Sequence, residues 1–326
     1  MIITNKTKGE NLTMSNFQLF IKNYLEYCST QKRLNEKTIK AYKIDLKQFY
    51  KQTHLTTVTE INQEILESYT TKLHMKYKPK TVKRKIASLK AFLHYLEYRE
   101  VIDVNPFNKV QIRFREAVTL PKTIPLYTVE KLLITMHAHC SNAKTDCQRR
   151  NALRDTAIVE LLFATGMRIS ELCTLKCEDV NLHDGIILIH GKGNKERRIQ
   201  IGNEEVLQIL NEYNNNYKMG IKHNNYFFVN QSGNAITDQS VRRMLNKYTA
   251  LADIDLHITP HMFRHTFATS LLEADVDIRY IQEMLGHSSI NVTEIYTHVA
   301  VSKQKDILTN KHPRKDFSFL GNQSVG

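Results

Sequence analysis

Apolar side chains recur every three or four residues in four stretches near the start of the chain, which is the spacing of an amphipathic helix. The expected helices lie at about residues 16–25, 36–51, 62–75 and 79–96. Ser15 or Asn16 is the expected N-cap of the first helix, since either side chain can accept a backbone N–H. Short connections between the four helices favour a compact bundle over one extended rod.

The helical pattern stops between Asn105 and Pro125, where the sequence turns basic and contains three prolines. Such a segment is typical of a linker. We therefore expect a polar leader at residues 1–14, a helical domain at 15–117, a second domain at 118–314 and a polar tail at 315–326.

The second domain mixes helix and strand patterns. Thr128 is the expected cap of one helix, and residues 151–164 have the apolar character of a buried helix. Residues 140–150 between them look like a surface insertion. Residues 185–189 and 197–201 flank a turn-rich segment and predict a β-hairpin. A further short strand is expected at residues 226–229, and the pattern is helical from Thr237 to about residue 309.

Composition supports a mainly α fold with a small antiparallel sheet. The 326 residues include only 11 glycines and 6 prolines, the residues that punctuate many-stranded β folds. The chain carries 46 Lys and Arg against 33 Asp and Glu, a formal net charge of +13, which favours a polyanionic partner such as nucleic acid. A solvated basic surface would give the same charge.

The five cysteines form an odd number in a chain large enough to fold without disulfides, which predicts free thiols and a reducing compartment. We expect a cytoplasmic protein, because neither a signal peptide nor a membrane span is evident. A zinc site is a weak alternative: the His and Cys residues near position 140 lack a Cys-x-x-Cys pair.

Four short segments contain residue types suited to chemistry on a phosphodiester. They are residues 165–172, 191–197, 261–268 and 285–298. Each is weak by itself, because an arginine after a glycine or a histidine on a helix is more often structural than catalytic. His265 and His298 are interpreted as structural for this reason.

Together and in this order, the four segments resemble the active site of the tyrosine site-specific recombinases, especially the Xer-type and phage or transposon integrases. That family uses an arginine, a hairpin lysine, a His-x-x-Arg pair, a second histidine and a tyrosine nine positions later. The matching residues here are Arg168, Lys192, His261, Arg264, His287 and Tyr296. The resemblance implies an N-terminal, SAM-like core-binding bundle and a mixed α/β catalytic domain, closing as a C-shaped clamp on DNA.

The chemistry explains these residue types. Two guanidiniums, Arg168 and Arg264, can meet the negative charge that builds on the non-bridging oxygens. Lys192, or Lys195 if the hairpin register differs, can protonate the leaving oxygen. The resemblance implies that Tyr296 forms a 3′-phosphotyrosyl link, with no metal or other cofactor.

The remaining roles follow in the same way. His261 would help to bind the phosphate and exchange the tyrosine proton, and His287 would hydrogen-bond a phosphate oxygen. Glu171 lies one helical turn after Arg168 and would brace it without taking part in the reaction.

Basic residues outside this set are expected to hold DNA through its phosphates. They are Lys80, Lys83, Arg84, Lys85, Lys90, Lys195, Arg197, Arg198, Arg242 and Arg243. The alternative for the lysines is a solvated helix exterior. The resemblance further implies inverted half-sites, a homodimer on each site, a homotetramer joined through a four-way Holliday junction, and a C-terminal helix passed to a neighbouring subunit.

Several questions remain open at this point. Packing of the C-terminal helix in cis is one alternative. A type IB topoisomerase would share the chemistry, and a DNA-binding regulator would share the shape, although a regulator predicts gaps in the catalytic set. The sequence does not separate chromosome-dimer resolution from movement of a transposon, phage or cassette, nor does it decide whether a second recombinase or an accessory protein takes part.

Overall fold

The structure is a computed structural model that describes residues 16–110, 122–191 and 196–286 of the chain. The chain divides into two compact units, residues 1–118 and 119–326. Each unit has its own hydrophobic core, so each is described by itself.

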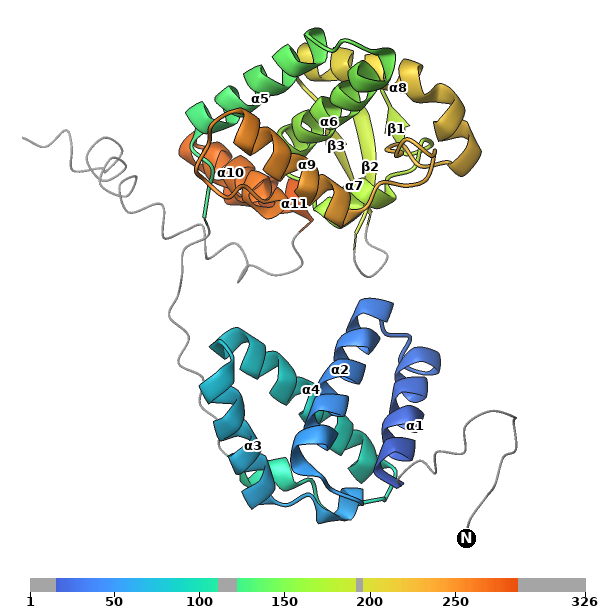
Figure 1. Ribbon diagram of the computed structural model, residues 1–326, viewed down its shortest axis with the longest axis vertical. Coiled ribbons are helices and arrows are strands. Elements are labelled where there is room, and N and C mark those ends of the chain that lie inside the picture. Colours follow the sequence, from blue (N-terminus) through green and yellow to red (C-terminus); the bar gives the residue numbers. More distant parts are fainter. Residues whose placement is uncertain (1–15, 111–121, 192–195, 287–326) are drawn as a thin grey trace, which may run out of the picture. The chain divides into compact units, whose positions relative to one another are not determined.

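The described residues of the N-terminal unit form four α-helices, shown in blue to teal in Figure 1. They are α1 (Asn16–Thr30), α2 (Glu36–Thr53), α3 (Gln63–Lys76) and α4 (Pro79–Tyr98). Two short 3₁₀ turns, Val58–Glu60 and Pro106–Lys109, complete the unit. All four helices expected from the periodicity are therefore confirmed; Ser15 lies outside the described residues, and Asn16 is the first helical residue.

Aromatic side chains fill much of this core. Phe17, Tyr24 and Phe92 are almost fully buried, and their rings meet at centroid distances of 5.4 to 6.2 Å. The helix ends follow from local chemistry: Asn62 accepts a hydrogen bond from the Ile65 amide at 3.0 Å to cap α3, and Pro79 occupies the first turn of α4. The periodic apolar face of each helix thus becomes one shared core.

The second unit is centred on α6 (Asp146–Thr165), which packs most extensively against three other helices. These are α5 (Leu126–Ser141), α8 (Glu204–Asn224) and α10 (Pro260–Glu273). The other helices among the described residues are α7 (Ile169–Thr174), α9 (Asp238–Leu251) and α11 (Ile278–Leu285). Ten residues of α6 are buried, so this helix forms the middle of the core.

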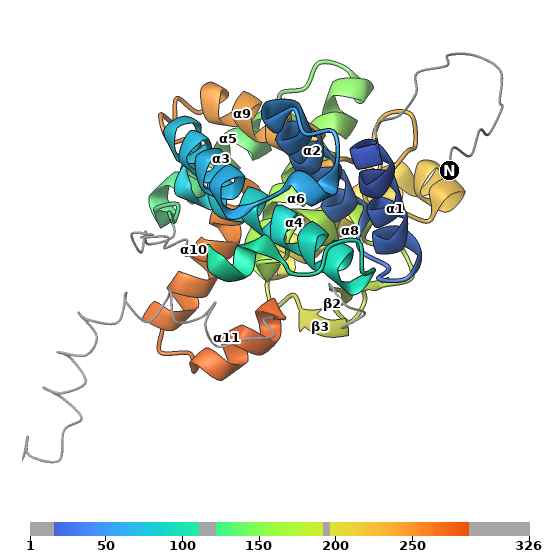
Figure 2. The ribbon, with the colours of Figure 1, turned by 90° about the horizontal axis from the view of Figure 1, so that it is seen from below.

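A three-stranded antiparallel sheet completes the second unit, in the order β1-β2-β3. Its strands are β1 (Val180–Asn181), β2 (Ile186–His190) and β3 (Glu196–Gln200). Ile187 pairs with Ile199, and both are buried. Helix α11 contacts β3 and lies beside it in Figure 2. The predicted hairpin and the mainly α fold class with a small antiparallel sheet are confirmed.

Two local predictions were wrong. Thr128 does not cap α5: the helix begins at Leu126 with Pro125 at the cap, and Thr128 is buried in the first turn. Leu126 and Tyr127 are exposed, so they do not continue the apolar periodicity from which the start was inferred. Most of residues 140–150 are exposed, so this segment lies at the surface as expected; it contains the end of α5 and the first turn of α6, and its being an insertion stays a prediction.

The second error concerns residues 226–229, which do not form a strand of the sheet. Tyr226 and Val229 make only isolated bridges, to Lys176 and Ala235 respectively. All five cysteines have free thiols, as expected. No described helix is long and apolar enough to cross a membrane.

Candidate active site

Arg168 stands at the turn between α6 and α7. Helix α6 ends at Gly166, whose φ of +59° lies in the left-handed region. A Cβ at this position would come within 2.6 Å of the Phe267 ring, so glycine is needed for space as well as for backbone conformation. This turn leaves the Arg168 side chain 34% exposed, where it can reach a ligand in solution.

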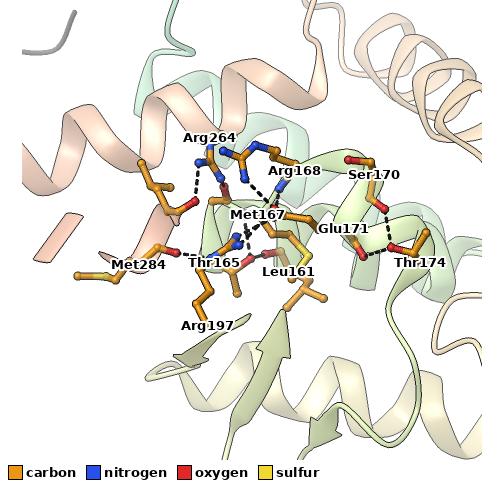
Figure 3. A network of polar contacts seen from close by, with 12 residues as sticks. Leu161, Thr165, Met167, Arg168, Ser170, Glu171, Thr174, Arg197, Arg264 and Met284 are labelled. Atoms are coloured by element: carbon orange, nitrogen blue, oxygen red, sulfur yellow. Dashed lines mark hydrogen bonds and ion pairs between the residues drawn. The ribbon is translucent and has the colours of Figure 1, made fainter. Parts of the chain in front are cut away.

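Glu171 holds this arginine in two ways. Its carboxylate accepts from the Arg168 backbone N–H at 2.9 Å and from Arg168 Nη1 at 2.7 Å (Figure 3). The carboxylate is 5% exposed, and burial alone would raise its pKa. Hydrogen bonds from Arg197 and Arg168 outweigh burial and hold the pKa of Glu171 below its ordinary value. Glu171 is therefore a buried, ionised partner of Arg168.

Arg197 is the second partner of the same carboxylate. Its Nη2 lies 2.7 Å from Glu171 Oε2, its Nη1 lies 3.2 Å from Oε1, and its Nε donates to the Met284 carbonyl oxygen at 2.8 Å (Figure 3). The Arg197 side chain is only 8% exposed. We expected Arg197 to contact a DNA phosphate, but its guanidinium faces protein groups instead. Arg198, the next residue, is exposed.

Arg264 projects from α10 towards the same turn. It is 4% exposed, and it donates from Nη1 to the Gly166 carbonyl at 2.9 Å and from Nη2 to the Leu285 carbonyl at 2.7 Å. Pro260 at the start of α10 begins the helix close before His261. The structure thus brings the Arg264 side chain to the backbone of the turn that carries Arg168.

His261 lies one helical turn before Arg264 and is exposed. Protein atoms around its ring displace water and lower its pKa, and the guanidiniums of Arg242, Arg264 and Arg168 lower it further. Burial likewise lowers the pKa of His265, with a further contribution from His261. The neutral imidazole of His261 is therefore favoured beside a cluster of three arginines.

Four predicted site residues lie outside the described residues: Lys192, Lys195, His287 and Tyr296. The described chain reaches both strands that flank the two lysines, and it reaches Gly286 immediately before His287. The structure therefore groups Arg168, Glu171, His261 and Arg264 and leaves the position of the other four as predictions.

His190, at the end of β2, was not singled out from the sequence. Its ring contacts Asp179 Oδ1 at 2.9 Å and Glu196 Oε1, on the facing strand, at 3.2 Å. The hydrogen bond to the Asp179 carboxylate raises the pKa of His190. A histidine between two carboxylates thus joins the last residue of β2 to the first of β3.

The basic residues of α4 fall into two groups. Lys80, Lys83, Arg84 and Lys90 are exposed. Lys85 is 4% exposed and pairs with the buried Asp45 at 3.0 Å. Arg84 contacts the same carboxylate, and Ser88 donates to it at 2.9 Å. Lys85 was expected to contact DNA, but it belongs to a buried ion pair instead. Arg242 and Arg243 on α9 are exposed.

Comparisons with known proteins point to one family. A model of the phage integrase family matches residues 129–303, and a model of the phage integrase N-terminal SAM-like domain matches residues 21–100. A tyrosine recombinase of Agathobacter rectalis is 69% identical over 306 residues, covering 94% of this chain and 100% of that protein. Tyrosine recombinase XerD of Listeria monocytogenes is 35% identical over 303 residues, covering 90% and 98%.

Among solved structures, the XerH site-specific recombinase bound to palindromic difH substrate, in a post-cleavage complex, has the same fold. Its TM-score is 0.73 at 20% identity, with 93% of this chain and 98% of that chain covered. The chain belongs to the phage integrase family, the tyrosine recombinases. It is an enzyme of site-specific DNA recombination.

Proposed function

We propose that the chain breaks and rejoins duplex DNA through a covalent 3′-phosphotyrosyl intermediate on Tyr296. The phenolic oxygen attacks the phosphorus, the P–O5′ bond breaks, and a free 5′-hydroxyl leaves. A 5′-hydroxyl from another strand then attacks the phosphotyrosine and releases Tyr296. The phosphodiester bond energy is conserved in the covalent link, so the cycle needs no ATP, metal or other cofactor.

Arg168 and Arg264 bind the non-bridging oxygens of the scissile phosphate and stabilise the charge that builds on them. The observation that carries this proposal is the meeting of these two arginines with His261 at one turn. Arg264 donates to the Gly166 carbonyl at 2.9 Å, and Arg168 follows two residues later. Such anchoring fixes the guanidiniums before substrate binds, which is what electrostatic stabilisation requires.

His261 accepts the proton of Tyr296 during attack and returns it during religation. The lowered pKa of His261 supports this role, because a base must be neutral before it can take a proton. His287 hydrogen-bonds a phosphate oxygen. Lys192 on the β2–β3 hairpin, with Lys195 as the substitute, protonates the leaving 5′-oxygen.

The two units hold the duplex mainly through its phosphates and form a C-shaped clamp on it. Exposed cations supply these contacts: Lys80, Lys83, Arg84, Lys90, Arg198, Arg242 and Arg243. Lys85 and Arg197 support them from the interior. The domain limits are 15–117 for DNA binding and 118–314 for catalysis, with a leader at 1–14 and a tail at 315–326.

A dimer binds two inverted half-sites, and two dimers form a tetramer that exchanges strands through a Holliday junction. The palindromic substrate of XerH supports such a site. The segment that follows Tyr296, up to residue 314, packs on a neighbouring subunit. A second recombinase or an accessory protein is compatible with this scheme. The setting is the cytoplasm, in Xer-type dimer resolution or in integration and excision of a mobile element.

The test is covalent capture on a nicked suicide duplex carrying the recombination site from the protein's genetic neighbourhood, with EDTA present. A denaturing gel should show a protein–DNA band for the wild-type chain and none for Tyr296→Phe, while DNA affinity changes less than about 3-fold. Tyr280→Phe is the matched control, because Tyr280 is an exposed tyrosine on α11. Retention of the band in Tyr296→Phe would reject the proposed nucleophile.

A further inference from the structure

Arg197 joins three segments that are far apart in the sequence. It belongs to β3, it reaches Glu171 at the start of α7, 26 residues away, and it reaches the Met284 carbonyl on α11, 87 residues away. All three nitrogens of its guanidinium take part in these contacts. With the side chain 8% exposed, the arginine is a buried junction between elements.

The end of α11 is fitted closely around this side chain. Gly286 ends the helix with a φ of +64°, and a Cβ there would lie 3.1 Å from both Cδ and Nη1 of Arg197. A side chain at position 286 would therefore have to displace Arg197 by a few tenths of an ångström, and it would be strained at this positive φ. Arg197 fixes the α11 terminus both by a hydrogen bond and by direct packing.

The opposite end of the junction carries Arg168. Glu171 accepts hydrogen bonds from Arg197 on both carboxylate oxygens, and it accepts one from Arg168 Nη1 at 2.7 Å. The contacts therefore run in a line from Met284 through Arg197 and Glu171 to Arg168 (Figure 3). Arg264 forms a second line, from the Leu285 carbonyl to the Gly166 carbonyl. Two buried arginines hold the last two carbonyls of α11 against the turn that carries Arg168.

We propose that Arg197 is a positioning residue of the recombinase. By holding the end of α11, it sets the position of His287, which follows that helix, relative to Arg168. This rests on the proposed function, in which Arg168 and His287 bind the same phosphate. Lysine cannot replace arginine here, because a single ammonium lacks the planar fork needed to meet Glu171 with two nitrogens while a third reaches Met284. Arg197 acts through Glu171 and α11 and does not itself touch DNA.

The test measures covalent product under single turnover, with protein in saturating excess over suicide DNA, for Arg197→Lys, Arg197→Gln, Glu171→Gln and the double variant Glu171→Gln/Arg197→Gln. Arg154→Lys is the matched control. Arg154 is also a poorly exposed arginine, 14%, paired with a carboxylate, Asp155 at 2.7 Å, but it lies on α6 and, within the part of the chain that the structure describes, has no hydrogen bond or ion pair with this junction. DNA affinity is measured separately for each variant.

Both Arg197 variants should cleave about 10- to 100-fold more slowly at saturation, while DNA affinity changes less than about 3-fold. The double variant should lose much less than the product of the two single losses, because both substitutions break one pair. Arg154→Lys should cleave within about 3-fold of wild type. A wild-type rate in Arg197→Lys, a defect confined to affinity, or an equal loss in Arg154→Lys would each overturn the proposal.

Hydrogen exchange separates this proposal from the proposed function, because it needs no cleavage. The Gly286 amide donates to the Glu283 carbonyl at 3.0 Å, so the α11 terminus has protected amides to follow. Arg197→Gln should speed exchange in peptides covering residues 281–286 and 168–172, and Arg154→Lys should not. Unchanged exchange in Arg197→Gln would reject the junction even if the wild-type chain formed no covalent product.

Discussion

Arg264 donates from Nη1 to the carbonyl oxygen of Gly166 at 2.9 Å across 98 residues of sequence. The bond ties a guanidinium on α10 to the backbone at the end of α6. The Gly166 amide is bonded to the Leu162 carbonyl of α6 at 3.0 Å, so the end of a buried helix anchors this long side chain. The geometry of the arginine cluster is therefore set by main-chain atoms as much as by side-chain packing.

Gly166→Ala should destabilise the catalytic unit by about 1–3 kcal/mol, because alanine is strained at positive φ and its Cβ would meet Phe267. Urea unfolding measures the change. Gly202→Ala is the matched control: no atom lies within 4 Å of a Cβ built at Gly202, and its φ is not in the left-handed region. Equal effects of the two substitutions would contradict the steric argument.

Arg242→Gln should raise the pKa of His261. Burial lowers this pKa most, and among the nearby charges that of Arg242 lowers it most. The pKa of His261 in the folded chain lies below its unfolded value. The contribution of His261 to stability is therefore present above the unfolded pKa and is lost as pH falls through the folded pKa. Histidine NMR titration measures the midpoint. Arg243→Gln, on the same helix, should leave it in place; a similar shift in both variants would remove the specific role of Arg242.

His190 should stabilise the chain more at low than at high pH. Its folded pKa is raised by the contact with Asp179, so its contribution is fully present below the unfolded pKa and is lost as pH rises through the folded pKa. The measurement is the difference in urea midpoint between wild type and His190→Gln from pH 5.5 to 8.5, which should shrink as pH rises. His183→Gln, at a 95% exposed histidine, serves as the control. A difference that grows with pH would reverse the assignment.

Lys85→Met should destabilise the chain by about 2–3 kcal/mol, less than the loss for a fully isolated buried charge, because Arg84 still contacts Asp45. Lys80→Met, an exposed change on the same helix, should alter stability by less than about 0.5 kcal/mol. Chemical denaturation of the full chain measures both.

DNA affinity at two salt concentrations gives the complementary result: loss of Lys80 should reduce the salt dependence, since that side chain can reach a phosphate. An equal stability loss in both variants would show that Lys85 is not a special buried partner.

Periodicity predicted the helices of the N-terminal unit because their apolar faces repeat over several turns. It could not fix the start of α5, where Leu126 and Tyr127 are helical but exposed. The segment at Tyr226 has strand composition, yet it makes only an isolated bridge to Lys176. Composition describes what a residue favours, whereas pairing depends on which backbone lies opposite.

The order of motifs predicted the residues that meet at the arginine cluster, but not where every cation points. The signal for Arg197 was present: strand alternation puts it on the same face as the buried Ile199. Lys85 likewise lies between Val82 and Leu89 on the buried face of α4, opposite an acid, Asp45, on the buried face of α2. A charge on an apolar face indicates an interior pair, and it is the partner, not the motif, that decides the direction of the side chain.

The dependence of the arginine cluster on α11 has a consequence for protein synthesis. Met284 and Leu285 supply carbonyl partners for Arg197 and Arg264, and both are made after every other described part of the cluster. A nascent chain still lacking them can fold its N-terminal helices, because that core is separate. It cannot yet assemble the centre proposed to break DNA. Under the proposed function, the order of translation therefore withholds strand-breaking activity from unfinished chains and from products of premature termination.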